Sequence, residues 1–140
     1  MNVKIHELMT DSVVSTEPHK TIDHVRRMME RNKVGAIPVV DSEGRPVGIV
    51  SSTDIVTGTN GKSPVSTIMT EKLYTVSKYD DVSIAARIMR NRRIHRVLVT
   101  HEQRLVGVLS AFDLLKLVEG RRYVDRNAPT GPKRGGSRRS

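Results

Sequence analysis

The chain has 140 residues, of which 24 are Lys or Arg and 15 are Asp or Glu, so its formal net charge is +9. It contains no cysteine, which excludes a disulfide framework, a thiolate nucleophile and a zinc knuckle. No apolar run approaches the roughly 20 residues of a transmembrane helix, and the N-terminus lacks the apolar core of a signal peptide, so we expect a soluble, cytoplasmic protein.

In chain order, the first half reads as a short strand, a helix, a β-hairpin and a second helix. Residues Val13 to Thr16 are rich in β-branched side chains and predict the strand. The helix has Thr21 as its expected N-cap. Its apolar stripe has steps of three and four residues: Ile22, Val25, Met28 and Met29. Hairpin strands are expected at Ala36–Val40 and Val47–Val50, and a second helix is expected after Ser51.

The second half repeats this order at an offset of 60 residues, which becomes 59 after a deletion near Gly44. A register kept over more than 40 positions indicates a tandem duplication. The helix after Asp81, its expected N-cap, has its stripe at Val82, Ala85, Ala86 and Met89. The matching strands are expected at Leu73–Val76, Arg96–Thr100 and Leu105–Leu109, and a last helix after Ser110 through Leu114, Leu115, Leu117 and Val118. Because a unit of about fifty residues cannot bury both of its helix stripes, we expect the two copies to pack together.

The chain therefore divides into a first repeat at residues 1–60, a second repeat at 61–119 and a basic C-terminal tail at 120–140. The tail has seven basic residues against Asp125 and thus a net charge of +6. It has too little apolar surface to offset the entropy of ordering, which predicts a flexible appendage beyond about Val124. Its charge could bind nucleic acid or a protein partner, or it could be a solubilising extension, and both interpretations remain open.

Three kinds of motif occur once in each half. The first half has Leu8-Met9-Thr10, Gly35-Ala36-Ile37-Pro38-Val39-Val40-Asp41 and Gly48-Ile49-Val50-Ser51-Ser52-Thr53-Asp54. The second half has Ile68-Met69-Thr70, Ile94-His95-Arg96-Val97-Leu98-Val99 and Gly107-Val108-Leu109-Ser110-Ala111-Phe112-Asp113. Together, over residues 3–118, they resemble a pair of CBS domains. The resemblance implies an α+β Bateman module, in which two β-α-β-β-α repeats pack sheet to sheet with pseudo-two-fold symmetry and leave two clefts between them. It also implies adenosine-containing ligands in the clefts and a homodimer of modules.

In this family the Asp of Gly-x-x-Ser/Thr-x-x-Asp binds ribose hydroxyls, and the hydroxyl residue and the helix start face the phosphate. Asp54 and Asp113 match the first position, and Ser51 and Ser110 match the second. A carboxylate can accept two charge-assisted hydrogen bonds from a cis-diol, and amides that open a helix favour an anion. The same Ser-x-x-Asp spacing is also a capping box, which needs no ligand. The two roles are compatible, because the serine can cap while the carboxylate faces the cleft.

A His-Arg pair holds the phosphate in those family members that sense AMP, ADP or ATP, and His95-Arg96 matches it. Carried over, the resemblance implies a first cleft formed by Asp54, Ser51, Thr53, His95 and Arg96. Arginine presents a planar fork of donors to phosphate oxygens, and a protonated histidine adds a charge-assisted bond. Arg92 and Arg93 would add positive potential near this cleft, although cations at a helix C-terminus are also explained by the helix dipole.

The second cleft is expected to be weaker. Gly35-Ala36 stands where the second repeat has His95-Arg96, so this cleft, with Asp113, Ser110 and Lys33, lacks the phosphate clamp. It is expected to be weak, empty or suited to a less anionic ligand. Candidates for an adenine pocket are aliphatic strand residues, which more often belong to the core: Val14, Ile37, Val76 and Val97.

No pair of the five histidines has a convincing metal-ligand spacing, and neither a P-loop nor a nucleophile elbow occurs. We therefore expect no metal site, no required cofactor and no enzymatic activity. The favoured hypothesis is a stand-alone regulatory module that binds AMP, ADP, ATP or S-adenosylmethionine and signals energy or metabolite state to a partner. The alternative is a scaffold that binds nucleic acid or protein through the basic tail. No membrane partner is expected.

Overall fold

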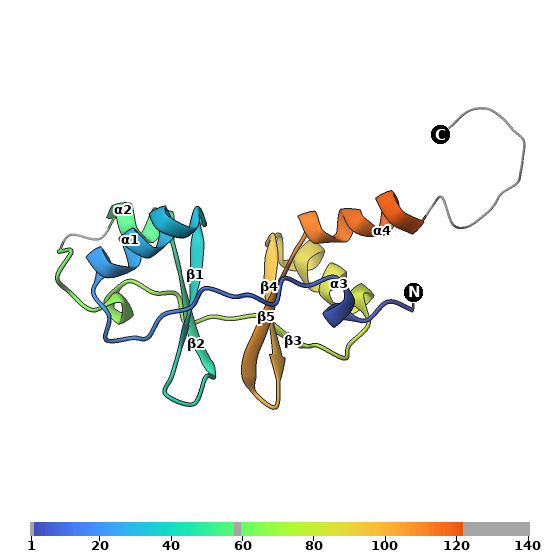
Figure 1. Cartoon of the computed structure of the whole chain (residues 1–140), viewed down its shortest axis with the longest axis horizontal. Coiled ribbons are helices and arrows are strands. Elements are labelled where there is room, and N and C mark those ends of the chain that lie inside the picture. The colour runs from blue at the N-terminus through green and yellow to red at the C-terminus, as the bar shows by residue number, and fades with distance from the viewer. Residues whose placement is uncertain (1, 58–59, 122–140) are drawn as a thin grey trace, which may run out of the picture.

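The structure is a computed structural model that describes residues 2–57 and 60–121. Two halves lie side by side, with the hairpin of each half near the centre and the helices farther out (Figure 1). The elements are η1 (Ile5–Glu7), α1 (Ile22–Asn32), β1 (Ala36–Val40), β2 (Pro46–Ser51), α2 (Ser52–Thr57), η2 (Val65–Thr67), β3 (Thr75–Ser77), α3 (Val82–Arg92), β4 (Arg96–His101), β5 (Arg104–Ser110), η3 (Phe112–Leu114) and α4 (Leu115–Arg121). The predicted α+β fold is confirmed, and most of the predicted tail lies outside the described residues.

Both predicted hairpins are present, and each observed strand matches its prediction or extends it at one or both ends. β1 pairs antiparallel with β2, and β4 pairs antiparallel with β5. Each hairpin has a bulge at the same repeat position, after Val39 in the first half and after Val99 in the second. Because a bulge is an irregularity that chance would not place twice, its repetition supports the duplication.

The strands expected ahead of α1 and α3 are shorter than predicted. The strand expected from Val13 is a single parallel bridge between Thr16 and Val39. The strand expected from Leu73 begins only at Thr75 and ends at Ser77, where β3 runs parallel to β4. The residues that precede both strand positions, Val13, Val14, Leu73 and Tyr74, line the clefts described below and lie outside the observed strands. The apolar composition therefore predicted strands that are longer than those observed.

The predicted helix caps are present in both halves. Thr21 Oγ1 accepts a hydrogen bond from the amide of His24 at 3.1 Å, and Asp81 Oδ2 accepts one from the amide of Ser83 at 2.9 Å. Hydrogen bonds from Ser83 hold the pKa of Asp81 below its usual range, since they favour the carboxylate. The stripes face the core, where Ile22, Val25, Met29, Val82, Ala85 and Met89 are buried. After Ser110 the chain forms the 3₁₀ turn η3 before α4, instead of one continuous helix.

Each half completes its core with a segment from the other repeat. Val3, Ile5 and Leu8, at the start of the first repeat, are buried in the core of the second half. Val65 of η2, at the start of the second repeat, is buried in the core of the first half. In Figure 1 the blue N-terminal chain and the green chain after η2 cross between the halves. The expected packing of the two copies is therefore achieved by an exchange of segments.

Both crossing segments form short antiparallel bridges. Thr10 exchanges two backbone hydrogen bonds with Val108, of 2.9 and 3.0 Å, and Thr70 exchanges two with Ile49, of 2.8 and 2.9 Å. Beside them, a Cβ at Gly107 would lie 2.5 Å from the sulfur of Met9, and a Cβ at Gly48 would lie 2.5 Å from the sulfur of Met69. The close approach of the two halves thus requires glycine at both strand positions.

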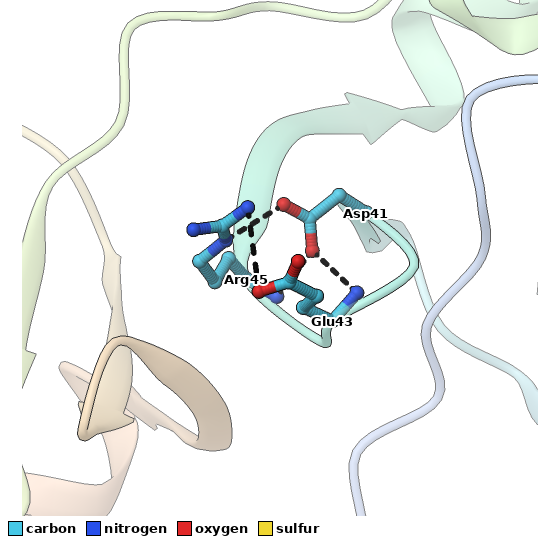
Figure 2. A network of polar contacts seen from close by, with 3 residues as sticks. All are labelled: Asp41, Glu43 and Arg45. Atoms are coloured by element: carbon cyan, nitrogen blue, oxygen red, sulfur yellow. Dashed lines mark hydrogen bonds and ion pairs between the residues drawn. The ribbon is translucent and has the colours of Figure 1, made fainter.

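The turn between β1 and β2 is held by one carboxylate (Figure 2). Asp41 Oδ1 accepts hydrogen bonds from the amides of Glu43 and Arg45, and Asp41 Oδ2 accepts one from Arg45 Nε, all at 2.9 Å. The hydrogen bond from the Arg45 amide is the main cause that lowers the pKa of Asp41 below its usual range. This network keeps the hairpin in register, and β2 leads directly into the first cleft.

Candidate functional site

Two cavities lie where the predicted clefts were expected. The first cleft has a volume of about 570 Å³ and is lined by Asp54 and His95 among others. The second cleft has a volume of about 390 Å³ and is lined by Asp113 and Lys33 among others. Both volumes fall within the roughly 300–1,000 Å³ of small-molecule sites.

The two linings correspond residue by residue through the repeat. Thr70, Tyr74 and Arg93 of the first cleft have the repeat positions of Thr10, Val14 and Lys33 of the second. Four residues line both clefts and form a shared wall: Ala36, Ile49, Arg96 and Leu98. The pair of clefts therefore follows the pseudo-two-fold relation, and the differences between them are differences of side chain.

Four of the five residues predicted for the first cleft line it: Ser51, Asp54, His95 and Arg96. Thr53 is exposed on α2 and is not among the lining residues. Arg92 and Arg93 were expected to add positive potential near this cleft. Arg93 lines the cleft, and the Arg92 guanidinium lies 5.6 Å from the centre of the Tyr74 ring.

Sequence reasoning missed Lys72 and Tyr74, which also line the first cleft. Tyr74 belongs to the segment interpreted as a strand, and Lys72 directly precedes that segment. The repeat offset was a usable signal for Tyr74, because Val14 was assigned to an adenine pocket and Tyr74 is its counterpart.

Lys33 and Arg93 reach the clefts through an unusual backbone. They are the C-caps of α1 and α3, and both have a left-handed conformation with φ of 56°. Such a position normally favours glycine, since other residues are strained there. The turn places a cation at the same point of each cleft.

The Ser-x-x-Asp motifs are capping boxes in both halves. The Ser51 amide donates to Asp54 Oδ2 at 2.8 Å, and the Asp54 amide donates to Ser51 Oγ at 3.2 Å. Ser110 and Asp113 repeat the pattern at 2.9 and 3.0 Å. Both aspartates also line their clefts, and each cap uses the Oδ2 oxygen of the carboxylate.

The helix starts offer less to a phosphate than expected. The Ser52 amide donates to the Gly35 carbonyl at 2.8 Å, and the Ala111 amide donates to the His95 carbonyl at 2.7 Å. The amides of Asp54 and Asp113 are occupied by the caps. Two amides at each helix start are therefore unavailable to an anion, which increases the share of the donors that side chains must supply.

The two aspartates have different surroundings. Asp113 is only 8% exposed, and its Oδ1 lies 3.3 Å from Lys116 Nζ. Lys116 also donates to the Leu8 carbonyl at 3.2 Å, so the crossing N-terminal segment holds it in place. The repeat position of Lys116 in the first half is Thr57, which brings no charge to Asp54.

The adenine-pocket candidates divide between cleft and core. Val14 lines the second cleft, but Ile37, Val76 and Val97 are 0%, 5% and 1% exposed, lie in the two cores and line neither cleft. In the hairpins, strand alternation explains why these residues miss the clefts. Arg96 and its neighbours on the same face of the strand face the clefts, so Val97 faces the core. The apolar lining comes instead from residues such as Leu73, Tyr74, Ile94, Val13 and Val34.

Within the part of the chain that the structure describes, no helix is long and apolar enough to cross a bilayer. Over the same residues, no three His, Asp or Glu side chains come together as they would around a metal ion.

Comparison with known proteins gives one consistent family. Residues 5–59 and 65–120 each match the model of the CBS domain. The CBS domain-containing protein YhcV of Bacillus subtilis is 30% identical over 115 residues, which cover 79% of this chain and 81% of that protein.

Two solved structures contain nucleotides. The CBS domain protein PAE2072 from Pyrobaculum aerophilum, complexed with AMP, is 30% identical with a TM-score of 0.73 and covers 84% of this chain and 100% of that one. The cytosolic domain of the Mg²⁺ channel MgtE, in complex with ATP, is 28% identical with a TM-score of 0.76 and covers 84% of this chain and 49% of that one.

Proposed function

The chain belongs to the CBS domain family, and from that premise we propose that it is a regulatory module that binds an adenosine-containing ligand. The ligands proposed first are AMP, ADP and ATP, bound in the first cleft, with S-adenosylmethionine as a further candidate. Occupancy of the cleft would signal energy or metabolite state to a separate protein partner.

The observation that carries this proposal is the charge distribution of the first cleft. Lys72, Arg93, His95 and Arg96 line it together with the single carboxylate of Asp54. A phosphate chain needs a cluster of donors such as arginine provides, and a ribose diol needs one acceptor. The complexes of PAE2072 with AMP and of MgtE with ATP support the same ligand class.

Tyr74 is the residue we assign to the base. It is the one Phe, Tyr or Trp side chain among the described residues that line the first cleft, and its counterpart in the second cleft is Val14. An aromatic face offers adenine a large apolar contact, while the aliphatic counterpart offers less area. The first cleft is thus the better nucleotide site on both charge and contact area.

A signal can leave the first cleft through the hydrogen bond between the His95 carbonyl and the Ala111 amide, at 2.7 Å. Ala111 precedes η3, and η3 and α4 present exposed apolar side chains at Phe112, Leu115 and Val118. We assign this surface to a second copy of the module, which gives a homodimer. Ligand binding shifts such a pairing only if its affinity differs between the two states.

The test is thermal unfolding of the full chain with AMP, ADP, ATP, S-adenosylmethionine and NAD in turn. A ligand at a hundred times its dissociation constant stabilises the folded state by about 2.7 kcal/mol, which raises the midpoint by about 8 °C for a domain of this size. We expect the shift with an adenine nucleotide, and its loss in Asp54→Asn and in the double variant His95→Ala/Arg96→Ala.

Arg87→Ala is the matched control, because Arg87 is a cation on α3 that lines neither cleft. It should keep the full shift. If a folded protein shows the same midpoint with every ligand at millimolar concentration, or if Arg87→Ala loses the shift equally, the proposed site is wrong.

A further inference from the structure

Arg96 has a position that no other charged side chain of residues 2–57 and 60–121 shares, since it lines both clefts. It is the first residue of β4, and its repeat counterpart, Ala36, is the first residue of β1. Ala36 also lines both clefts, but it offers no charge. The wall between the clefts therefore carries one guanidinium where the pseudo-symmetry would allow two.

The strand register explains why Arg96 reaches both sides. Arg96 pairs with Ser110 on β5, and Ser110 lines the second cleft together with Asp113. Along its own strand, Arg96 follows His95, which lines the first cleft. The side chain is exposed, and no ion pair holds it to an acidic group of the described residues.

The two clefts depend on this guanidinium to different degrees. Without Arg96, the basic residues that line the first cleft are still Lys72, Arg93 and His95, whereas Lys33 is the one basic residue left among the described residues that line the second cleft. An arginine side chain that turns into one cleft to hold a phosphate through a bidentate pair of donors points away from the other cleft. Whichever cleft engages Arg96 therefore removes it from the other, and the second cleft loses more.

We propose, on the basis of the proposed nucleotide site, that Arg96 is a phosphate clamp shared between the clefts. A nucleotide in the first cleft takes the guanidinium, and the second cleft then favours an adenosine ligand without a phosphate. The coupling is reciprocal, because it is one free energy that links two binding events.

Direct repulsion between two bound phosphates would also weaken the second binding event, but it predicts a different effect of mutation. If Arg96 is shared, Arg96→Ala abolishes the coupling, since neither cleft then has the clamp to lose. If repulsion is the cause, Arg96→Ala leaves the coupling in place or increases it, since a screening charge is gone.

The experiment is isothermal titration calorimetry of the full chain with AMP and with adenosine. Asp54→Asn/His95→Ala disables the first cleft and reports the second cleft alone, with Arg96 free. We expect the second cleft to bind AMP on the order of tenfold more tightly in this variant than in the native protein with its first cleft filled. Adenosine should bind the second cleft with the same affinity in this variant and in the native protein. When Arg96→Ala is added to both proteins, the ratio of their AMP affinities at the second cleft should fall to about one.

Three results would overturn the proposal. A coupling that persists in the Arg96→Ala background would assign it to repulsion. A native protein that binds one AMP, with no AMP bound by the Asp54→Asn/His95→Ala variant, would leave the proposed function intact and remove the shared clamp. No AMP bound by any of the proteins would overturn the proposed function as well.

Discussion

Thr16 and Val76 occupy the same repeat position with different chemistry. Both are 5% exposed. The backbone of Thr16 is satisfied, because its amide donates to the Pro38 carbonyl at 3.0 Å and its carbonyl accepts from the Val40 amide at 2.8 Å. Its hydroxyl, however, is buried without a hydrogen-bond partner among the described residues. A hydroxyl in that position costs about 1–3 kcal/mol.

Thr16→Val, which copies the second repeat, should therefore raise the free energy of unfolding by about 1 kcal/mol. The two side chains have nearly the same shape, so the change removes the unpaired hydroxyl and opens no cavity. Urea denaturation measures the difference. Val76→Thr is the matched control and should lower stability, and a loss of stability in Thr16→Val would mean that the hydroxyl has a partner.

At the scale of elements, the two halves are joined at the crossings where a methionine lies against a glycine of a strand. A Cβ on Gly107 would meet the sulfur of Met9 at 2.5 Å and the carbonyl oxygen of Thr10 at 3.0 Å. The methionine can rearrange, but the carbonyl oxygen belongs to the bridge between Thr10 and Val108 and cannot move freely.

Gly107→Ala should therefore destabilise the protein by about 1–3 kcal/mol through overpacking of this crossing. Gly35→Ala is the control, because the nearest atom to its Cβ would be Ser52 Oγ at 4.0 Å. Thermal unfolding of both variants gives the comparison. Equal midpoints for the two variants would show that the crossing accommodates a methyl group.

At the scale of the whole molecule, the largest apolar exposure lies on the short helices after the hairpins. Phe112, Leu115 and Val118 are 77%, 57% and 62% exposed on η3 and α4, and Val56, the repeat counterpart of Leu115, is 83% exposed on α2. Contiguous exposed apolar surface marks an interaction site more often than a free surface. The repetition of the feature at one repeat position suits a symmetric interface between copies.

Leu115→Glu/Val118→Glu should convert the proposed homodimer into single modules, because it places two charges in an apolar contact. Light scattering with size-exclusion chromatography gives the mass directly. Tyr79→Glu is the control, since Tyr79 is also exposed but lies on the turn before α3, and it should remain dimeric. A native protein with the mass of one chain would remove the homodimer from the proposal.

The sequence by itself was sufficient for the features that depend on local periodicity and spacing. Both hairpins and the caps at Thr21 and Asp81 follow from patterns within a few residues, the duplication follows from the register at an offset of 60 residues, and all were predicted. The motif serines and aspartates line the cavities for which they were proposed, because each cap holds its aspartate at a set distance from the end of a strand. Alternation along β4 could even have excluded Val97, since Arg96 was already expected to face the cleft.

Only the tertiary structure decided what depends on contacts between residues far apart in the chain. The exchange of Val3 and Val65 into the opposite cores, and the hydrogen bond from Lys116 to the Leu8 carbonyl, arise from packing between the halves. The place of Arg96 between the two clefts is of the same kind. A repeat in sequence predicts two similar units, but it is the pseudo-symmetric packing of those units that brings their edges together, and a residue at that contact serves both.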